Sequence, residues 1–210
     1  MYKHFIKRVI DIVGSFCGIV VLGIPMLVIA AKIKSEDPGP AIFKQKRVGK
    51  KKDGKITYFE LYKFRSMKLS TPHDVPTHML SNPEQYLLKC GKTIRKYSLD
   101  ELPQMFNILK GDMAIIGPRP ALWNQDDLVA EREKYGANDV KPGLTGWAQI
   151  NGRDELEIPI KAKYDGEYAE KEGLLMDAKC FFGTIGKVFK SEGVVEGGTG
   201  EMKKQMENEK

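Results

Sequence analysis

The sequence predicts an α/β fold in which one compact domain is attached to an apolar N-terminal segment. With 210 residues, the chain is long enough for one cored domain and too short for two. Residues 12–31 carry no charged side chain, residues 58–63 alternate as strand residues do, and helical patterns follow over residues 160–171 and 174–190. We therefore expect a membrane anchor over residues 1–34, a domain over residues 35–190 and a flexible tail over residues 191–210, where few apolar residues occur.

The N-terminal apolar run is about long enough to cross a bilayer as a helix. Pro25, close to Gly23, removes a helical hydrogen bond and favours a bend inside the run. Basic residues, which prefer the cytoplasmic side, flank both ends of the run. They are Lys3, Lys7, Arg8, Lys32 and Lys34. A re-entrant helix-break-helix satisfies both facts, whereas a kinked spanning helix and a signal peptide cleaved near Ala31 remain open alternatives.

The elements of the domain follow from turn residues and periodicity. After the turn cluster at residues 38–40, residues 41–67 predict strands that form a hairpin around a turn at residues 50–54. Residues 70–82 are rich in polar residues and proline and predict a loop, after which Pro83 begins a helix that runs to about Tyr97. A short helix over residues 105–109 ends at Gly111. In residues 174–190 the apolar side chains cluster on one side and the lysines near the other, which indicates either an interfacial membrane helix or a helix packed on the core.

Composition restricts the class of partner. The formal charge of +6, from 34 basic and 28 acidic residues, suggests an anionic partner such as phospholipid, nucleic acid or a phosphorylated substrate. Cys17, Cys90 and Cys180 lie far apart, so we expect neither a disulfide framework nor a zinc site, and a reducing cytosolic environment. His73 and His78 lie in the polar loop without further obvious metal ligands.

The segment S-L-D-E-L-P-Q, residues 98–104, holds the principal candidates for catalysis. Ser98 and Glu101 have the spacing of a capping box, which would give both a purely structural role. Pro103 argues against that interpretation, because inside a regular helix it would break the hydrogen bond to Leu99. The adjacent carboxylates of Asp100 and Glu101, at a bent helix start, suit one nucleophile and one metal ligand.

Basic residues occur near this pair in the sequence. Lys63 and Arg65 lie in residues 61–67, Arg95 lies just before the pair, and Arg119 lies between two prolines. The flanking prolines restrict the backbone, which lowers the entropy that is lost when the guanidinium of Arg119 binds a phosphate.

A glycine-rich segment, residues 141–153, offers further donors through Gln149, Asn151 and Arg153. It could equally be a structural loop anchored by Trp147. The sequence contains neither a P-loop nor a Rossmann fingerprint.

Together these motifs resemble those of the bacterial sugar transferases, the monotopic phosphoglycosyl transferases that begin glycoconjugate assembly on undecaprenyl phosphate. The resemblance extends from residue 5 to about residue 190. The segments that carry it are residues 43–49, 62–67, 98–104, 110–113, 116–120 and 142–153. One departure is that G-I-P, residues 23–25, stands where small members of the family have Ser-Pro at the break of the membrane helix.

The resemblance implies a re-entrant membrane helix, an α/β domain with amphipathic interfacial helices, and a site at the cytosolic face of the bacterial inner membrane. Asp100 would attack the β-phosphorus of a UDP-sugar, expel UMP and carry the sugar phosphate until polyprenol phosphate displaces it. Glu101 would bind Mg²⁺. The implied substrate-binding residues are Lys63, Arg95, Arg119, Gln149 and Arg153. Membrane phospholipid and downstream glycosyltransferases are further expected partners.

Three alternatives belong to other classes of mechanism or function. A scaffold that binds nucleotide sugars without turnover would release no UMP, and an enzyme that uses a ternary complex would form no adduct with the donor alone. Nucleic-acid binding is disfavoured, because the charges adjoin an apolar anchor and no aromatic stacking platform. The sequence does not reveal which sugar is transferred.

Overall fold

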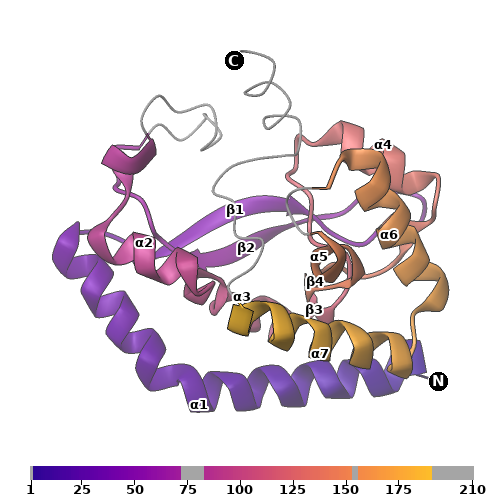
Figure 1. Cartoon of the computed structure of the whole chain (residues 1–210), viewed down its shortest axis with the longest axis horizontal. Helices are drawn as coiled ribbons and strands as arrows, with labels where there is room; N and C mark the ends of the chain where they lie inside the picture. The colour runs from indigo at the N-terminus through magenta and orange to yellow at the C-terminus, as the bar shows by residue number, and fades with distance from the viewer. Residues whose placement is uncertain (1, 72–82, 153–155, 191–210) are drawn as a thin grey trace.

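The computed structural model describes residues 2–71, 83–152 and 156–190. It is a mixed α/β structure, mostly helical, in which two small two-stranded sheets are surrounded by helices (Figure 1). The predicted loop with His73 and His78, the residue Arg153 and the predicted tail at residues 191–210 lie outside the described residues.

Helices make up most of the chain, and short strands lie between them. The α-helices are α1 (Lys7–Glu36), α2 (Lys89–Lys96), α3 (Gln104–Lys110), α4 (Asp126–Glu133), α5 (Trp147–Asn151), α6 (Ile158–Lys171) and α7 (Leu174–Lys190). The strands are β1 (Ile42–Val48), β2 (Tyr58–Phe64), β3 (Ala114–Ile116) and β4 (Gly143–Thr145). Shorter helical turns are η1 (Tyr2–Ile6), η3 (Pro83–Tyr86), η4 (Leu99–Glu101) and η5 (Ala137–Asp139).

The predicted hairpin is confirmed. β1 and β2 pair antiparallel from Ile42 opposite Phe64 to Val48 opposite Tyr58, and Asp53 and Gly54 adopt positive φ in the turn between them. The predicted end of the short helix is confirmed as well, because Gly111 terminates α3 with φ 102°.

The helix that was predicted to begin at Pro83 is shorter than expected. A 3₁₀ turn starts at Pro83, but α2 begins only at Lys89. The intervening Leu88 is extended and donates its backbone N–H to the carbonyl of Ser66 at 3.0 Å. This tertiary hydrogen bond satisfies the Leu88 amide outside the helix and thereby delays the helix start.

The second sheet was not predicted. β3 and β4 are parallel and only three residues long, and glycines permit their close approach. A Cβ atom on Gly143 would lie 2.1 Å from the backbone N of Gly117, so no side chain fits there. This sheet leads directly into the segment that contains Arg119.

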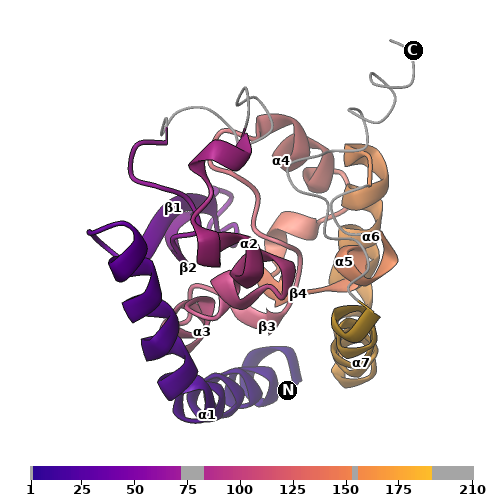
Figure 2. The same ribbon diagram turned by 60° about the vertical axis from the view of Figure 1, so that its left-hand side comes forward.

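α1 is the helix, among the described residues, that is long and apolar enough to cross a membrane. It is continuous from Lys7 to Glu36 with Pro25 inside it, and it changes direction along its length as it runs under the domain (Figures 1 and 2). The predicted break is therefore not an interruption of the helix. The structure has a bent helix in its place.

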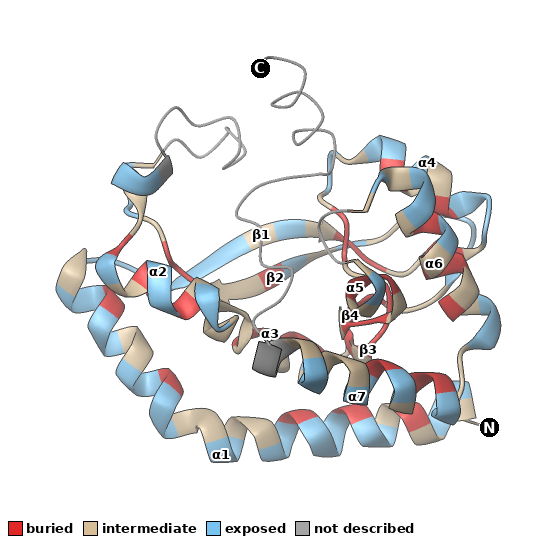
Figure 3. Ribbon diagram, viewed as in Figure 1, coloured by how far each residue is buried: buried red, intermediate tan, exposed pale blue. Residues whose placement is uncertain are grey.

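The two sides of α1 differ in polarity, opposite to the pattern of a helix in water. Lys7, Asp11 and Ser15, four residues apart, are buried and point to the domain. Apolar side chains on the other side are more than half exposed (Figure 3). They include Phe16, Val20, Val21, Ile24, Leu27 and Val28. An exposed apolar patch of this kind marks a surface for lipid or protein.

The N-terminal part of α1 is attached to the domain through polar contacts. Arg8 donates to the backbone carbonyls of Ile108 and Leu109, at 2.6 and 2.8 Å, near the end of α3. The carboxylate of Asp11 accepts the backbone N–H of Ile115 in β3 at 2.8 Å. These bonds give hydrogen-bond partners to two carbonyls near the end of α3 and to one backbone N–H of β3.

The C-terminal part of α1 is attached through apolar contacts. Met26 and Ile33 are buried in a core cluster that also includes Phe64 of β2 and Ile94 of α2. Both halves of α1 therefore pack on the same domain, and the exposed apolar side lies between and beyond these attachments.

Glycines set the distance between α1 and the domain. A Cβ atom on Gly14 would lie 2.7 Å from Cδ1 of Ile115, and one on Gly18 would lie 2.8 Å from the sulfur of Met105. A Cβ atom on Gly23 would meet nothing within 4 Å.

We expect Gly14→Leu to lower the thermal unfolding midpoint in detergent, because the larger side chain forces Ile115 and β3 away from α1 at a cost of about 1–3 kcal/mol. Gly23→Leu is the matched control and should leave the midpoint unchanged or raise it. Equal midpoints for the two variants would contradict the close seating of α1 on β3.

Candidate active site

A tight turn positions the two candidate carboxylates. Ser98 adopts the left-handed conformation with φ 54°, η4 follows with Asp100 and Glu101, and Pro103 stands at the N-cap of α3. Ser98 forms no side-chain capping bond to η4, and Glu101 binds two cations. The capping-box interpretation is thus not supported by the structure. Instead, the turn exposes two neighbouring carboxylates to one site.

Glu101 is the better paired of the two carboxylates. Its Oε1 accepts from Nζ of Lys63 at 3.0 Å and from Nη2 of Arg119 at 2.7 Å, and its side chain is 12% exposed. Burial opposes ionisation, but the charges and hydrogen bonds of Arg119 and Lys63 outweigh it and hold the pKa of Glu101 well below its ordinary value. Glu101 is therefore an anion fixed in place by two cations.

Asp100 is more weakly paired. Its Oδ2 lies 3.9 Å from Nζ of Lys63, and within the described residues its carboxylate accepts no hydrogen bond. Burial raises the pKa of Asp100, the charge of Glu101 adds to this, and Lys63, Arg95 and Arg119 partly offset it. The two neighbouring carboxylates thus have pKa values displaced in opposite directions, and Asp100 is held by its cations less closely than Glu101 is.

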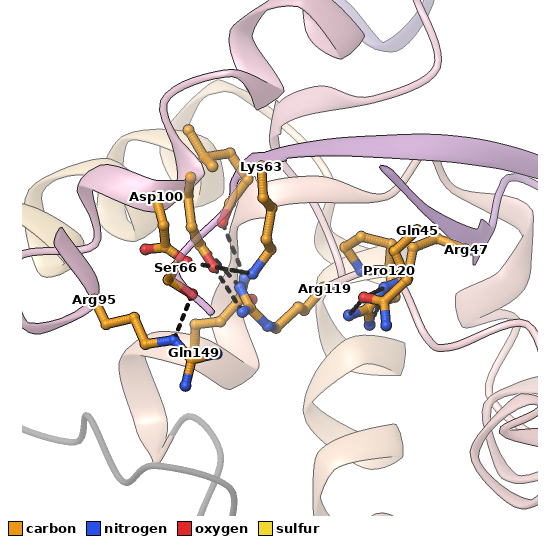
Figure 4. A network of polar contacts seen from close by, with 11 residues as sticks. Gln45, Arg47, Lys63, Ser66, Arg95, Asp100, Arg119, Pro120 and Gln149 are labelled. Carbon is orange, nitrogen blue, oxygen red and sulfur yellow. Dashed lines mark hydrogen bonds and ion pairs between the residues drawn. The ribbon is translucent and has the colours of Figure 1, made fainter. Parts of the chain in front are cut away.

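The other predicted site residues surround this pair (Figure 4). Nε of Arg95 donates to Oγ of Ser66 at 2.8 Å, which places the guanidinium beside Asp100. Gln149 donates to the carbonyl of Leu144 at 3.3 Å, and its Oε1 is buried without a hydrogen-bond partner. The structure therefore brings together the residues that the resemblance assigns to the site, except Arg153, which lies outside the described residues. Arg65 instead pairs with Asp37, and the amide of Asn151 donates to the carbonyl of Trp147.

A supporting layer behind Arg119 was not recognised in the sequence. Arg132 forms a buried ion pair with Asp165 at 2.6 Å and donates to the backbone carbonyl of Arg119 at 2.9 Å. Arg47 of β1 donates to the carbonyl of Pro120 at 3.0 Å (Figure 4). Arg47 lies in one of the segments that carry the family resemblance, but Arg132 and Asp165 stand 33 positions apart and no sequence pattern connects them.

A cavity of about 290 Å³ is lined in part by Glu101, the residue that follows Asp100. Its wall includes Glu101, Arg119 and Gln149 on one hand and apolar side chains from several elements on the other. The apolar residues are Leu102, Met105, Ile115, Leu144, Ile150, Phe181 and Ile185. Polar residues that also line it are Tyr97, Ser98, Thr145, Thr184 and Lys187. One part of the cavity wall can thus contact an ionic group, and another part can contact an apolar group.

The residues present also fit a divalent cation of the magnesium type. No cluster of three or more Asp, Glu, His or Cys ligands occurs within the described residues. Magnesium, however, commonly binds through one or two carboxylates and completes its shell with phosphate and water oxygens. Asp100 and Glu101 supply such carboxylates, and a cation at Glu101 would compete with Lys63 and Arg119.

These features define a class of site. Three cations arranged around two carboxylates are suited to phosphate groups, and a carboxylate that is only weakly paired is a candidate nucleophile toward phosphorus. The exposed apolar side of α1 places this site beside a surface suited to lipid. A cluster of cations next to a helix with an exposed apolar side suits an enzyme that handles phosphate groups at a membrane.

Comparison with known proteins identifies the family. The chain belongs to the bacterial sugar transferase family, whose pattern matches residues 2–191. It is 38% identical over 189 residues to the uncharacterized sugar transferase EpsL of Bacillus subtilis, with 90% of each chain covered.

Two further relatives carry more specific names. The chain is 38% identical over 200 residues to the UDP-glucose:undecaprenyl-phosphate glucose-1-phosphate transferase of Escherichia coli, covering 89% of this chain and 41% of that protein. It is 39% identical over 188 residues to the UDP-N-acetylgalactosamine-undecaprenyl-phosphate N-acetylgalactosaminephosphotransferase of Aeromonas hydrophila, covering 86% and 43%. The chain thus spans about two fifths of the length of these two relatives.

Proposed function

We propose that the protein is a phosphoglycosyl transferase that moves a sugar phosphate from a UDP-sugar to undecaprenyl phosphate. The products are UMP and an undecaprenyl-diphospho-sugar, which begins glycoconjugate synthesis. The names of the two characterised relatives support the substrate classes. The observation that carries the proposal is the placement of Asp100 and Glu101 among Lys63, Arg95 and Arg119.

The chemistry proceeds in two displacements at one phosphorus atom. An oxygen of the Asp100 carboxylate attacks the β-phosphorus of the donor, the bond to the bridging oxygen breaks, and UMP leaves with that oxygen. The sugar phosphate is then bound to Asp100 as an acyl phosphate. An oxygen of undecaprenyl phosphate attacks the same phosphorus, and the bond to Asp100 breaks to restore the carboxylate.

The electrostatics favour Asp100 as the nucleophile. The oxygens of Glu101 are engaged by Lys63 and Arg119, whereas Asp100 meets its nearest cation only at 3.9 Å. A carboxylate that is already fully hydrogen-bonded is a poorer nucleophile, because its lone pairs must first be released. The partly desolvated Asp100 has a raised pKa and correspondingly higher basicity.

The cations take the phosphates of the donor. Arg119, fixed by Arg132 behind it, presents a planar guanidinium that can hold two phosphate oxygens. Lys63 and Arg95 complete the positive surroundings. Gln149 has a buried carbonyl oxygen without a partner and would accept a hydrogen bond from the substrate. Arg153 is assigned to substrate binding on the resemblance alone.

Magnesium would bind at Glu101. When bound, it would neutralise charge on the diphosphate and on the departing UMP. No general base is needed for the second displacement, since the acceptor is already an anion.

The shape of α1 supports a re-entrant anchor at the cytosolic face of the bacterial inner membrane. A straight spanning helix would have its two ends on opposite sides of the bilayer. In α1, Lys7 and Asp11 near one end and Ile33 near the other all contact the same domain. The exposed apolar side would enter the lipid, while the attached domain stays in the cytosol with the soluble donor.

The decisive experiment measures UMP release and covalent labelling. With Mg²⁺ and undecaprenyl phosphate, we expect release of UMP from at least one member of a panel of UDP-sugars. With the donor alone, mass spectrometry should find one phospho-sugar on Asp100, and Asp100→Asn should abolish both signals. An unlabelled but active enzyme would indicate a ternary complex. The absence of UMP release with every donor would favour a binding scaffold.

The rate of adduct formation should depend on pH through Asp100. The carboxylate must be ionised to attack, so the rate falls as the pH decreases through the raised pKa of Asp100. Lys63 lowers this pKa, and Lys63→Met should therefore move the acidic limb of the normalised profile to higher pH. Lys44→Met, which removes an exposed lysine paired with Glu60, is the control. A limb that stays in place or moves to lower pH contradicts the assignment.

The anchor model predicts that both flanks of α1 face the same side of the membrane. Single cysteines at Lys3 and Ser35, in a chain whose native cysteines are replaced, should both react with a membrane-impermeant maleimide in inverted vesicles. Neither should react in sealed right-side-out vesicles. Reaction of one position in each preparation would show that α1 spans the bilayer.

A further inference from the structure

The cavity beside the carboxylates has an apolar part that the donor does not explain. Phe181 and Ile185 of α7 line it opposite Met105 of α3 and Ile115 of β3. Its volume of about 290 Å³ is just below the roughly 300–1,000 Å³ of pockets that enclose a whole drug-sized ligand. The cavity therefore suits one segment of a larger molecule.

A sugar ring matches the apolar part poorly. It carries several hydroxyl groups, and each buried hydroxyl needs a partner. Thr145 and Thr184 bond to each other at 2.7 Å, and Glu101 is paired with cations. Among the described lining residues, Gln149 alone has a fully buried side-chain atom without a hydrogen-bond partner. The polar groups of Tyr97, Ser98 and Lys187 also line the cavity, but the side chains of its apolar part offer no hydrogen-bond partners for a ring of hydroxyl groups.

The cavity is separated from α1 by a single layer of side chains. Ile115 and Met105 line the cavity and also meet α1 at Gly14 and Gly18. Figures 1 and 2 show α7 lying near the N-terminal part of α1, and Lys7 joins the two helices through Asp177 at 2.5 Å. An apolar chain that comes from the lipid beside α1 therefore has a short path to the cavity.

Charge at the same cavity suits the head of such a chain. Lys187 of α7 and Arg119 both line it, so a phosphate that follows an apolar chain would find cations there. The position of α7 is fixed by the bond between Thr184 and Thr145 and by the contact of Gly183 with Ile150. The apolar wall and Lys187 are therefore held as one unit.

We propose that this cavity binds the phosphate-proximal isoprene end of the lipid acceptor, with Phe181 and Ile185 against the chain and Lys187 at its phosphate. The proposal rests on the proposed function and adds a site for the second substrate. It separates the two substrates spatially: the donor diphosphate lies at Lys63, Arg95 and Arg119, and the acceptor enters from α7.

The test measures the two half-reactions separately in the full chain in detergent, with the donor that releases UMP. In Ile185→Glu, the adduct should form at the wild-type rate, but its discharge by farnesyl phosphate should slow by about tenfold or more, because a carboxylate replaces part of the apolar wall. Lys187→Met should raise the acceptor KM and leave the donor KM unchanged. Leu175→Glu, at an exposed position of α7 outside the cavity wall, is the matched control and should discharge normally.

Three results would overturn the proposal. Equal slowing of adduct formation and discharge in Ile185→Glu would assign the cavity to the donor. Normal discharge would remove the acceptor from it. Equal slowing in Leu175→Glu would show a general effect on lipid contact. If the wild-type protein releases no UMP from any donor, the proposed function itself is refuted, which is a different outcome.

A binding measurement that needs no turnover completes the test. A farnesyl phosphate with a diazirine on its first isoprene unit should cross-link to peptides that line the cavity, from α7, α3, α5, β3 and β4, and excess farnesyl phosphate should prevent it. Cross-links confined to elements that do not line the cavity would place the acceptor elsewhere, whether or not the protein is active.

Discussion

Lys7, at the start of α1, is held in a buried ion pair with Asp177 of α7 at 2.5 Å, and Tyr168 bonds to both partners. A buried pair of this kind is fixed in geometry, because loss of either partner would leave an uncompensated charge. The contact ties the apolar helix α1 to the C-terminal helix α7. Since α7 forms part of the cavity wall, the seating of α1 also determines the cavity.

α1 also holds the elements that carry the candidate catalytic residues. Arg8 binds the last carbonyls of α3, whose first turn follows Asp100 and Glu101, and Asp11 binds β3, which leads to Arg119. One helix therefore holds the two elements that carry the carboxylates and the principal cation. The distance between the site and the exposed apolar side of α1 is thus a fixed property of the fold.

The electrostatics of the site follow from unequal sharing of the cations. Lys63 lies 3.0 Å from Glu101 and 3.9 Å from Asp100, and Arg119 binds Glu101 at 2.7 Å. Two chemically similar carboxylates are thus given different properties, one as a fixed anion and one as a partly desolvated group. Unequal pairing with the same cations is therefore enough to give two adjacent acids different properties, without a residue of another type.

The elements that the sequence predicted are those with a local signal. The alternation at residues 58–63 predicted β2, the position of Gly111 predicted the end of α3, and Pro103 argued correctly against a capping box at Ser98. β3 and β4 were missed because three residues are too few for a period to appear. α4 was not predicted either, because its apolar residues Leu128 and Val129 are neighbours in the sequence and do not form a stripe at helical spacing.

For the site, the motif around Asp100 and its cations could be found because each residue lies in a distinctive segment. The support by Arg132 and Asp165 could not, since a contact between residues far apart in the chain leaves no local pattern. The stripe of Lys7, Asp11 and Ser15 at four-residue spacing was visible in the sequence and would have indicated which side of α1 meets the domain.

That polar stripe has a consequence for biogenesis. An isolated α1 in hydrocarbon would present the carboxylate of Asp11 to lipid without the β3 amide that binds it, and a polar group there is costly. The segment is consequently poorly suited to independent release into the bilayer during synthesis. For the proposed anchor, we therefore expect insertion to depend on folding of the downstream domain, so that the newly made chain acquires its lipid-embedded and water-facing parts together.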